Sequence, residues 1–209
     1  MNTYIVIIGD IEQSKQLSPN DRRQVQNELE SVFEELNRSS ANIVSPYTIT
    51  LGDEFQVVYD SAGEIFKHIW TIMAAVHPVF VRFSIGVGKI TTGVNKRNSL
   101  GMDGPAFYKA RECIEQMKKQ KILLSVSTEK AKFNRLVNSA FLILEADLRS
   151  WKKNRFLILQ KMYEEKEVKQ IAKEIGLSDV AIYKNINAGT LKALRELTES
   201  ISETIEEML

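Results

Sequence analysis

Two stretches decide the fold of this chain: Tyr4-Ile5-Val6-Ile7-Ile8-Gly9-Asp10 and Tyr47-Thr48-Ile49-Thr50-Leu51-Gly52-Asp53-Glu54-Phe55. Each is a strand-like run rich in β-branched and aromatic residues, and each ends in a carboxylate. Two carboxylates at neighbouring strand ends can share a divalent cation, and that cation can hold a polyphosphate. The alternative is that Asp10 is a turn or cap residue and that Gly52-Asp53 is a plain hairpin turn.

The pattern around these motifs predicts one compact unit over residues 1–127. The expected elements are strand 3–9, helix 21–37, hairpin 47–59, helix 61–76, strand 79–90, helix 105–119 and strand 121–126. Ser61 and Glu64 form a capping-box pattern at the start of the second helix. This order predicts an α+β fold, with a mostly antiparallel sheet covered by helices on one face.

Composition sets broad limits on the class of protein. The chain has 209 residues and a net charge of +1, which suits one or two domains and says nothing about partners. The single cysteine, Cys113, excludes an intramolecular disulfide framework and favours a reducing compartment. No apolar run reaches membrane-spanning length and no leader pattern precedes the first strand, so we expect a cytoplasmic protein without a membrane partner.

The character of the chain changes after residue 127. From Thr128 onward the sequence is helical throughout, and no Gly or Pro occurs between Ala106 and Ile175. We therefore expect a second, all-α region over residues 128–209. Because no flexible linker joins the two regions, they should pack together or be connected by a stiff helix.

Residues 155–195 predict a helix-turn-helix. Ala172 allows two helices to approach closely, and Gly176 supplies the left-handed turn between them. Leu177, Val180 and Ile186 are expected to fill the core. The residues expected to face DNA are Ser178, Asp179, Ala181, Tyr183 and Lys184. A plain helical bundle with a glycine turn is the alternative.

Charge within the helical region favours the DNA-binding interpretation. Residues 152–195 carry ten Lys and Arg against five Asp and Glu, as phosphate contacts require. Residues 196–209 carry five acidic side chains and no basic ones, so this tail should stay off DNA. Its stripe of Leu197, Ile201, Ile205 and Met208 suits a partner helix, and we expect a homodimer through it.

Four motifs resemble the bacterial SatD family over roughly residues 3–115. They are Ile7-Ile8-Gly9-Asp10-Ile11, Thr48-Ile49-Thr50-Leu51-Gly52-Asp53-Glu54-Phe55-Gln56, Val81-Arg82-Phe83-Ser84-Ile85-Gly86-Val87-Gly88 and Asp103-Gly104-Pro105-Ala106-Phe107-Tyr108-Lys109-Ala110-Arg111. This resemblance implies no established chemistry.

The same motifs resemble, in the same order, the catalytic domain of class III nucleotide cyclases, which implies a ferredoxin-like α+β fold. On that resemblance Asp10 and Asp53 would hold Mg²⁺ or Mn²⁺, and Arg111 would be catalytic, stabilising charge on the transferring phosphate. The candidate nucleotide-binding residues are Gly9, Ile11, Gly52, Lys89 and Arg111.

Two departures argue against cyclase activity. Phe107 stands where cyclases carry a catalytic Asn. The base-selecting Lys of adenylate cyclases would fall near Ile49 in this sequence, which is apolar. The C-terminal helix-turn-helix, in turn, resembles region four of sigma factors. We therefore expect a transcription regulator whose cyclase-like domain senses a nucleotide and whose helix-turn-helix binds DNA. The alternatives are a metal-dependent enzyme acting on a nucleoside triphosphate and an inactive interaction scaffold.

Overall fold

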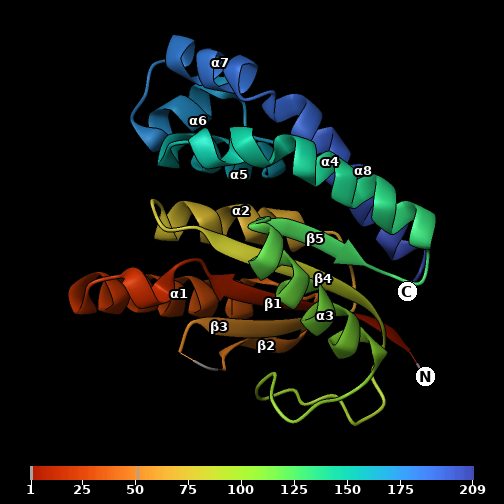
Figure 1. Cartoon of the computed structure of the whole chain (residues 1–209). Coiled ribbons are helices and arrows are strands. Elements are labelled where there is room, and N and C mark those ends of the chain that lie inside the picture. The colour runs from red at the N-terminus through yellow and green to blue at the C-terminus, as the bar shows by residue number, and fades with distance from the viewer. Residues whose placement is uncertain (1, 51) are drawn as a thin grey trace.

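A five-stranded sheet forms the centre of the computed structural model, which describes residues 2–50 and 52–209 (Figure 1). Leu51 of the second acidic motif lies outside the described residues. The strands, in spatial order, are β2 (Ile43–Ile49), β3 (Glu54–Tyr59), β1 (Thr3–Ile11), β4 (Val81–Lys89) and β5 (Leu124–Ser127). Neighbouring strands are antiparallel except β4 and β5, which are parallel. The expected α+β class and the hairpin around Gly52-Asp53 are thus confirmed.

Eight α-helices occur in the described ranges. They are α1 (Pro19–Ser39), α2 (Ile65–Val76), α3 (Pro105–Gln120), α4 (Ala131–Ser150), α5 (Lys153–Tyr163), α6 (Val168–Ile175), α7 (Asp179–Ala188) and α8 (Leu191–Glu206). A short 3₁₀ turn, η1 (Ser14–Gln16), follows β1. Among the described residues, no helix combines the length and apolar character needed to cross a membrane.

Helices cover both faces of the sheet, whereas the order of elements in the sequence predicted helices on one face only. Ile5 and Ile7 of β1 pack with α1 and α2, whereas Val6 and Ile8 pack with α3 on the other face. Successive side chains of a strand point to opposite faces, so Ile5 to Ile8 of β1 are all apolar because both faces of the strand are covered. The unbroken apolar run of β1 is typical of such a strand.

The start of α2 also differs from the expectation. Its N-cap is Glu64, which makes no side-chain capping bond, so the Ser61–Glu64 capping box is wrong. The Glu206 carboxylate at the end of α8 accepts hydrogen bonds from Ser61 Oγ (3.1 Å) and from the backbone N–H of Ala62 (2.6 Å). The Glu64 carboxylate instead accepts from Ser40 and Asn42. Tertiary partners have replaced the local pair.

The C-terminal helices pack on the outer side of α2. The Trp70 ring of α2 stacks on Phe156 of α5, with centroids 6.5 Å apart, and Phe66 meets Phe141 of α4. Figure 1 shows α4, α5 and α8 as a layer over α2, with α6 and α7 at one end of it. The two regions therefore pack together, as expected from the missing linker, and the apolar core crosses residue 127 without interruption.

The apolar stripe of α8 is used inside the chain. Ile201 and Ile205 are buried against α2 and α5, while Leu197 and Met208 are half-buried. The expectation that residues 197–208 form a dimer contact is therefore wrong, because this face already has a partner. Part of the partner of α8 is α2, an apolar helix of the N-terminal half, and the sequence pattern of α8 alone does not identify it.

Candidate functional site

Three charged residues lie side by side on the sheet, on the face that α3 covers. Backbone pairing places Asp10 of β1 opposite Glu54 of β3 on one side and opposite Arg82 of β4 on the other. Directly opposed residues of antiparallel strands share a face. Asp10 also shares the face of Val6 and Ile8, which pack against α3. Glu54, Asp10 and Arg82 thus form a row, and each is less than a tenth exposed.

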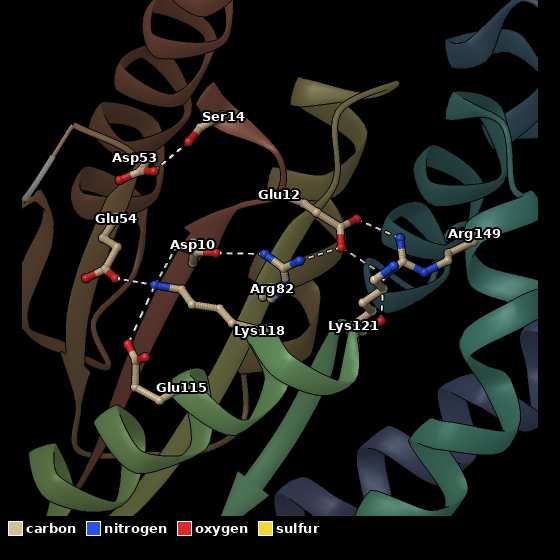
Figure 2. Close-up of polar contacts among 10 residues, drawn as sticks. All are labelled: Asp10, Glu12, Ser14, Asp53, Glu54, Arg82, Glu115, Lys118, Lys121 and Arg149. Atoms are coloured by element: carbon tan, nitrogen blue, oxygen red, sulfur yellow. Dashed lines mark hydrogen bonds and ion pairs between the residues drawn. The ribbon is translucent and has the colours of Figure 1, made fainter. Parts of the chain in front are cut away.

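Basic side chains of α3 reach into this row. Lys118 Nζ lies 3.1 Å from Asp10 Oδ1, 2.9 Å from Glu54 Oε1 and 3.7 Å from Glu115 Oε1 (Figure 2). Arg111 Nη1 donates to the other Glu54 oxygen at 2.6 Å. The cations therefore neutralise the carboxylates within the site, which lowers the cost of burying them.

The pairing extends to the C-terminal helices through Glu12. Arg82 Nη1 donates to Asp10 (2.9 Å) and its Nη2 to Glu12 (2.6 Å). Arg149 of α4 then donates to the second oxygen of Glu12 at 2.6 Å, and to Glu145 at 2.6 Å. We call this set the charged cluster: Asp10, Glu12, Glu54, Arg82, Arg111, Lys118 and Arg149. It joins three strands, α3 and α4 (Figure 2).

The two carboxylates of the row respond differently to this environment. Burial raises the pKa of Asp10, and the bonds from Lys118 and Arg82 offset this rise only in part. For Glu54, burial is outweighed by the bonds from Arg111 and Lys118, so its pKa is lowered. Burial disfavours the charge on Lys118, but Glu54 and Asp10 raise its pKa, so Lys118 stays an ammonium ion.

Asp53 lies beside the charged cluster without joining it. Its carboxylate accepts a hydrogen bond from Ser14 Oγ at 2.5 Å, and its carbonyl accepts from Ile11 N–H at 2.9 Å. An open pocket of about 350 Å³ contains Asp53 and Asp10 together with Ser14, Lys15, Arg82 and Lys118. The structure thus brings the two predicted aspartates to one pocket, but it places Glu54 and not Asp53 beside the Asp10 carboxylate.

The arrangement does not fit a divalent-metal site. Across the described residues, no group of three or more His, Cys, Asp or Glu side chains is placed to hold a metal ion. Asp10 and Glu54 already bond to Lys118, and Asp53 bonds to Ser14. A metal needs free carboxylate oxygens, and here ammonium and guanidinium groups bond to both oxygens of Asp10 and both oxygens of Glu54.

The other predicted nucleotide-binding residues do not form one site. A Cβ on Gly9 would lie 2.0 Å from the Phe55 ring, so this glycine makes room for a core side chain. Lys89 pairs with Thr3 and lies seven residues along β4 from Arg82, about 23 Å away at about 3.3 Å per residue. Lys89 therefore lies far along the strand from the Arg82 part of the charged cluster. Ile11 and Gly52 border a second pocket next to Asp53.

Phe107 stands in the core between α3 and the sheet. It is 9 % exposed, and its cluster includes Val6, Ile8 and Val58. The position where cyclases carry a catalytic Asn therefore serves packing in this chain.

Helices α6 and α7 meet at a tight glycine turn. Gly176 has φ +74°, a left-handed conformation that glycine adopts without strain, and the Leu177 N–H bonds back to Ala172. Ser178 caps α7 by accepting a hydrogen bond from Ala181 N–H at 3.2 Å. Gly176 thus takes the expected conformation, and Ser178 has a local structural role.

The expected DNA-facing residues lie on α7 with most of their side chains in solvent. Ser178, Asp179, Tyr183 and Lys184 are exposed, and Ala181 is half-buried. Val180, which was expected in the core, is 77 % exposed; Ile182 is buried in its place, next to Ile186. The α7 surface therefore carries Val180 and Tyr183 as exposed apolar groups beside Lys184.

Comparison with known protein families adds to this geometry. The profile of the SatD family matches residues 4–202, nearly the whole chain. The chain belongs to the SatD family. A search of curated proteins found no match.

In this SatD family member, sequence reasoning missed several charged residues that complete the site. Glu12, Lys118 and Arg149 carried no motif, and Arg82 was noted only as part of a strand. One signal was available: Lys118 lies seven residues after Arg111, which places both on one face of a helix. Arg149 could not have been found, because its contact with Glu12 spans 137 residues.

Proposed function

We propose that this protein is a transcription regulator, with an N-terminal domain that binds an anionic ligand such as a nucleotide and a C-terminal helix-turn-helix that binds DNA. The exposed surface of α7 carries this proposal. It follows a tight turn, begins at a capped N-terminus and presents Val180 and Tyr183 to solvent at 77 % and 54 % exposure. Isolated exposed residues are common, but two large apolar ones beside a lysine on one short helix favour a binding surface.

The position of α7 is also favourable. Its contacts are with α5, α6 and α8, and Figure 1 shows it at the outer end of the helical layer. A duplex could therefore approach α7 without meeting the sheet. The basic composition of residues 152–195 supplies phosphate-binding groups around it.

The order of the elements supports a cyclase-like N-terminal domain. The strands β2-β3-β1-β4 are all antiparallel, with α1 and α2 as the two crossovers on one face. This is the arrangement expected of a ferredoxin-like fold, to which α3 and β5 are added. The pocket with Lys15, Ser14, Arg82 and Lys118 is the candidate place for phosphate groups.

The enzyme alternative has weaker support. Arg111 is bonded to Glu54, Phe107 is part of the core, and the carboxylates do not fit a metal pair. Glu12 instead accepts hydrogen bonds from Arg82 and Arg149, and these bonds connect the candidate ligand pocket to α4. A ligand that competes for these cations would change contacts between the sheet and the helical layer, which suits a sensor.

Binding to duplex DNA is the direct test. We expect the full chain to retain a mixed-sequence duplex at low salt, and the affinity to fall steeply as salt rises because phosphate contacts release counterions. Lys184→Ala should weaken binding on all sequences and reduce the salt slope by about 1, while Tyr183→Ala should change sequence preference. Fluorescence anisotropy over a salt series measures both effects.

Lys119→Ala is the matched control, since Lys119 is exposed on α3, far from α7 along the chain. It should leave DNA affinity unchanged. If the wild-type chain does not bind DNA at low salt, or if Lys119→Ala weakens binding as much as Lys184→Ala, the helix-turn-helix proposal is wrong.

A homodimer is expected through α4, since α8 is already covered. Leu136, Leu142 and Ile143 on α4 are 72 %, 57 % and 81 % exposed. An antiparallel second copy of α4 would place Leu136 against Ile143 of the partner subunit, and Lys132 against Asp147 of the partner subunit. In this arrangement, apolar side chains of the two copies would contact each other and opposite charges would face each other.

Ile143→Glu should therefore convert a dimer to a monomer, because it puts a carboxylate among apolar groups at the contact. Sedimentation velocity on the full chain measures this change. Val180→Glu, an equally exposed apolar site on α7, is the control and should leave the dimer intact. A wild-type chain that is monomeric at high concentration would contradict the expectation.

A further inference from the structure

We infer that the Lys118 ammonium is a built-in cation, which takes the place of a divalent metal ion between Asp10 and Glu54. The candidate nucleotide site then works without metal. The nucleotide part of this inference rests on the proposed function, whereas the cation part rests only on the contacts of Lys118.

The contacts of Lys118 are those of a bound cation. Its Nζ lies 3.1 Å from Asp10 Oδ1 and 2.9 Å from Glu54 Oε1, and the Glu115 carboxylate stands 3.7 Å away. Figure 2 shows these three carboxylates around one ammonium group. The carboxylates come from β1, β3 and α3, so the cation joins the helix to two strands across the sheet face.

The charges leave a definite place for one cation. Arg82 bonds to one oxygen of Asp10 and Arg111 to one oxygen of Glu54, and in both residues the second oxygen faces Lys118. Without Lys118, two nearly buried oxygens would face each other with no cation between them. Two negative charges that close together repel each other strongly, because water has little access to this site and the repulsion is poorly screened.

A divalent ion could take that place if Lys118 were shortened. Mg²⁺ and Mn²⁺ are commonly bound by one or two carboxylates and several waters. Asp10 and Glu54 would supply two carboxylates, and the exposed Glu115 could turn inward as a third. Removing the ammonium also removes the one positive charge that lies between the two free oxygens and repels a metal ion there.

Titration of the full chain with Mn²⁺ tests the cation part without any nucleotide. Binding is measured as the loss of the electron-spin-resonance signal of free Mn²⁺. We expect Lys118→Ala to bind Mn²⁺ at least about tenfold more tightly than wild type, and Asp10→Asn in the Lys118→Ala background to abolish this gain. Mn²⁺ should also raise the melting temperature of Lys118→Ala but not that of wild type. Lys119→Ala, next in the chain, should behave like wild type.

Two results would overturn the inference. One is a folded Lys118→Ala protein with no gain in Mn²⁺ affinity. The other is a wild-type protein whose Mn²⁺ binding is already tight and is lost in Asp10→Asn. If Lys118→Ala does not fold, Lys118→Ser shortens the side chain and removes its charge in the same way, and the wild-type titration still decides the second result.

The nucleotide part has its own measurement. Wild-type protein should bind a nucleoside triphosphate with the same affinity in EDTA as in Mg²⁺. An affinity at least tenfold lower in EDTA would show that a metal is needed and would overturn this part. No binding in either buffer would count against the nucleotide half of the proposed function, while the Mn²⁺ titration would still decide the role of Lys118.

Discussion

Arg82→Ala is expected to lower the free energy of unfolding by about 3–5 kcal/mol. Arg82 is 8 % exposed and bonds to Asp10 and Glu12, which are also buried. Removing Arg82 takes one of two cations from each nearly buried carboxylate, leaving only Lys118 beside Asp10 and Arg149 beside Glu12, and the protein cannot easily hydrate the oxygens that lose their partner. Urea denaturation, monitored by circular dichroism, measures the change in the free energy of unfolding.

Two further variants separate charge from packing. Arg82→Met fills most of the same volume but should cost nearly as much, because Asp10 and Glu12 still lose their shared cation. Adding Asp10→Asn and Glu12→Gln to Arg82→Met should recover part of the loss. Arg97→Ala, on the exposed loop after β4, should stay within about 0.5 kcal/mol of wild type. An Arg82→Ala variant that loses less than about 1 kcal/mol would show that the charged cluster contributes little to stability.

Most elements of the sheet could be predicted because their signals are local. The alternation in β4, the apolar run of β1 and Pro105 at the start of α3 each depend on neighbouring residues only. The helix faces were harder. The apolar pattern of α8 shows that it needs a partner, but it cannot tell α2 of the same chain from a second copy.

The candidate site was predicted only in part, for a related reason. Asp10 and Asp53 were found from their place at strand ends, and both border one pocket. Which carboxylate lies beside Asp10 depends on strand register, and the register favours Glu54. A shift of one residue turns a side chain to the other face, so a prediction accurate to a few residues cannot choose between Asp53 and Glu54.

The core position on α7 was also predicted wrongly because it depends on contacts between distant parts of the chain. Val180 and Ile182 both fit an apolar helix pattern, and only the packing of α7 against α5 and α6 buries Ile182 and exposes Val180. The exposed Val180 then becomes an argument for function, because an apolar side chain left in solvent on a binding helix is available to a partner.

Phe156→Ala is expected to lower the free energy of unfolding by about 3–5 kcal/mol and to destabilise both regions of the chain together. Phe156 of α5 is fully buried, stacks on Trp70 of α2 at 6.5 Å and meets Trp151 at 5.2 Å. Truncating a ring there removes apolar contacts from both sides of the boundary at residue 127.

This coupling is what a sensor requires. Packed contacts that make the helical layer and the sheet unfold together can also carry the effect of a ligand bound near the sheet to α7. We therefore expect one unfolding transition in urea for wild type and for Phe156→Ala, observed equally by near-ultraviolet and far-ultraviolet circular dichroism. Val180→Ala, in the same helical region but 77 % exposed, should stay within about 0.5 kcal/mol of wild type. Two separate transitions, with only the less stable one shifted by Phe156→Ala, would show that the regions unfold independently, and a signal from the charged cluster would then have no packed route to α7.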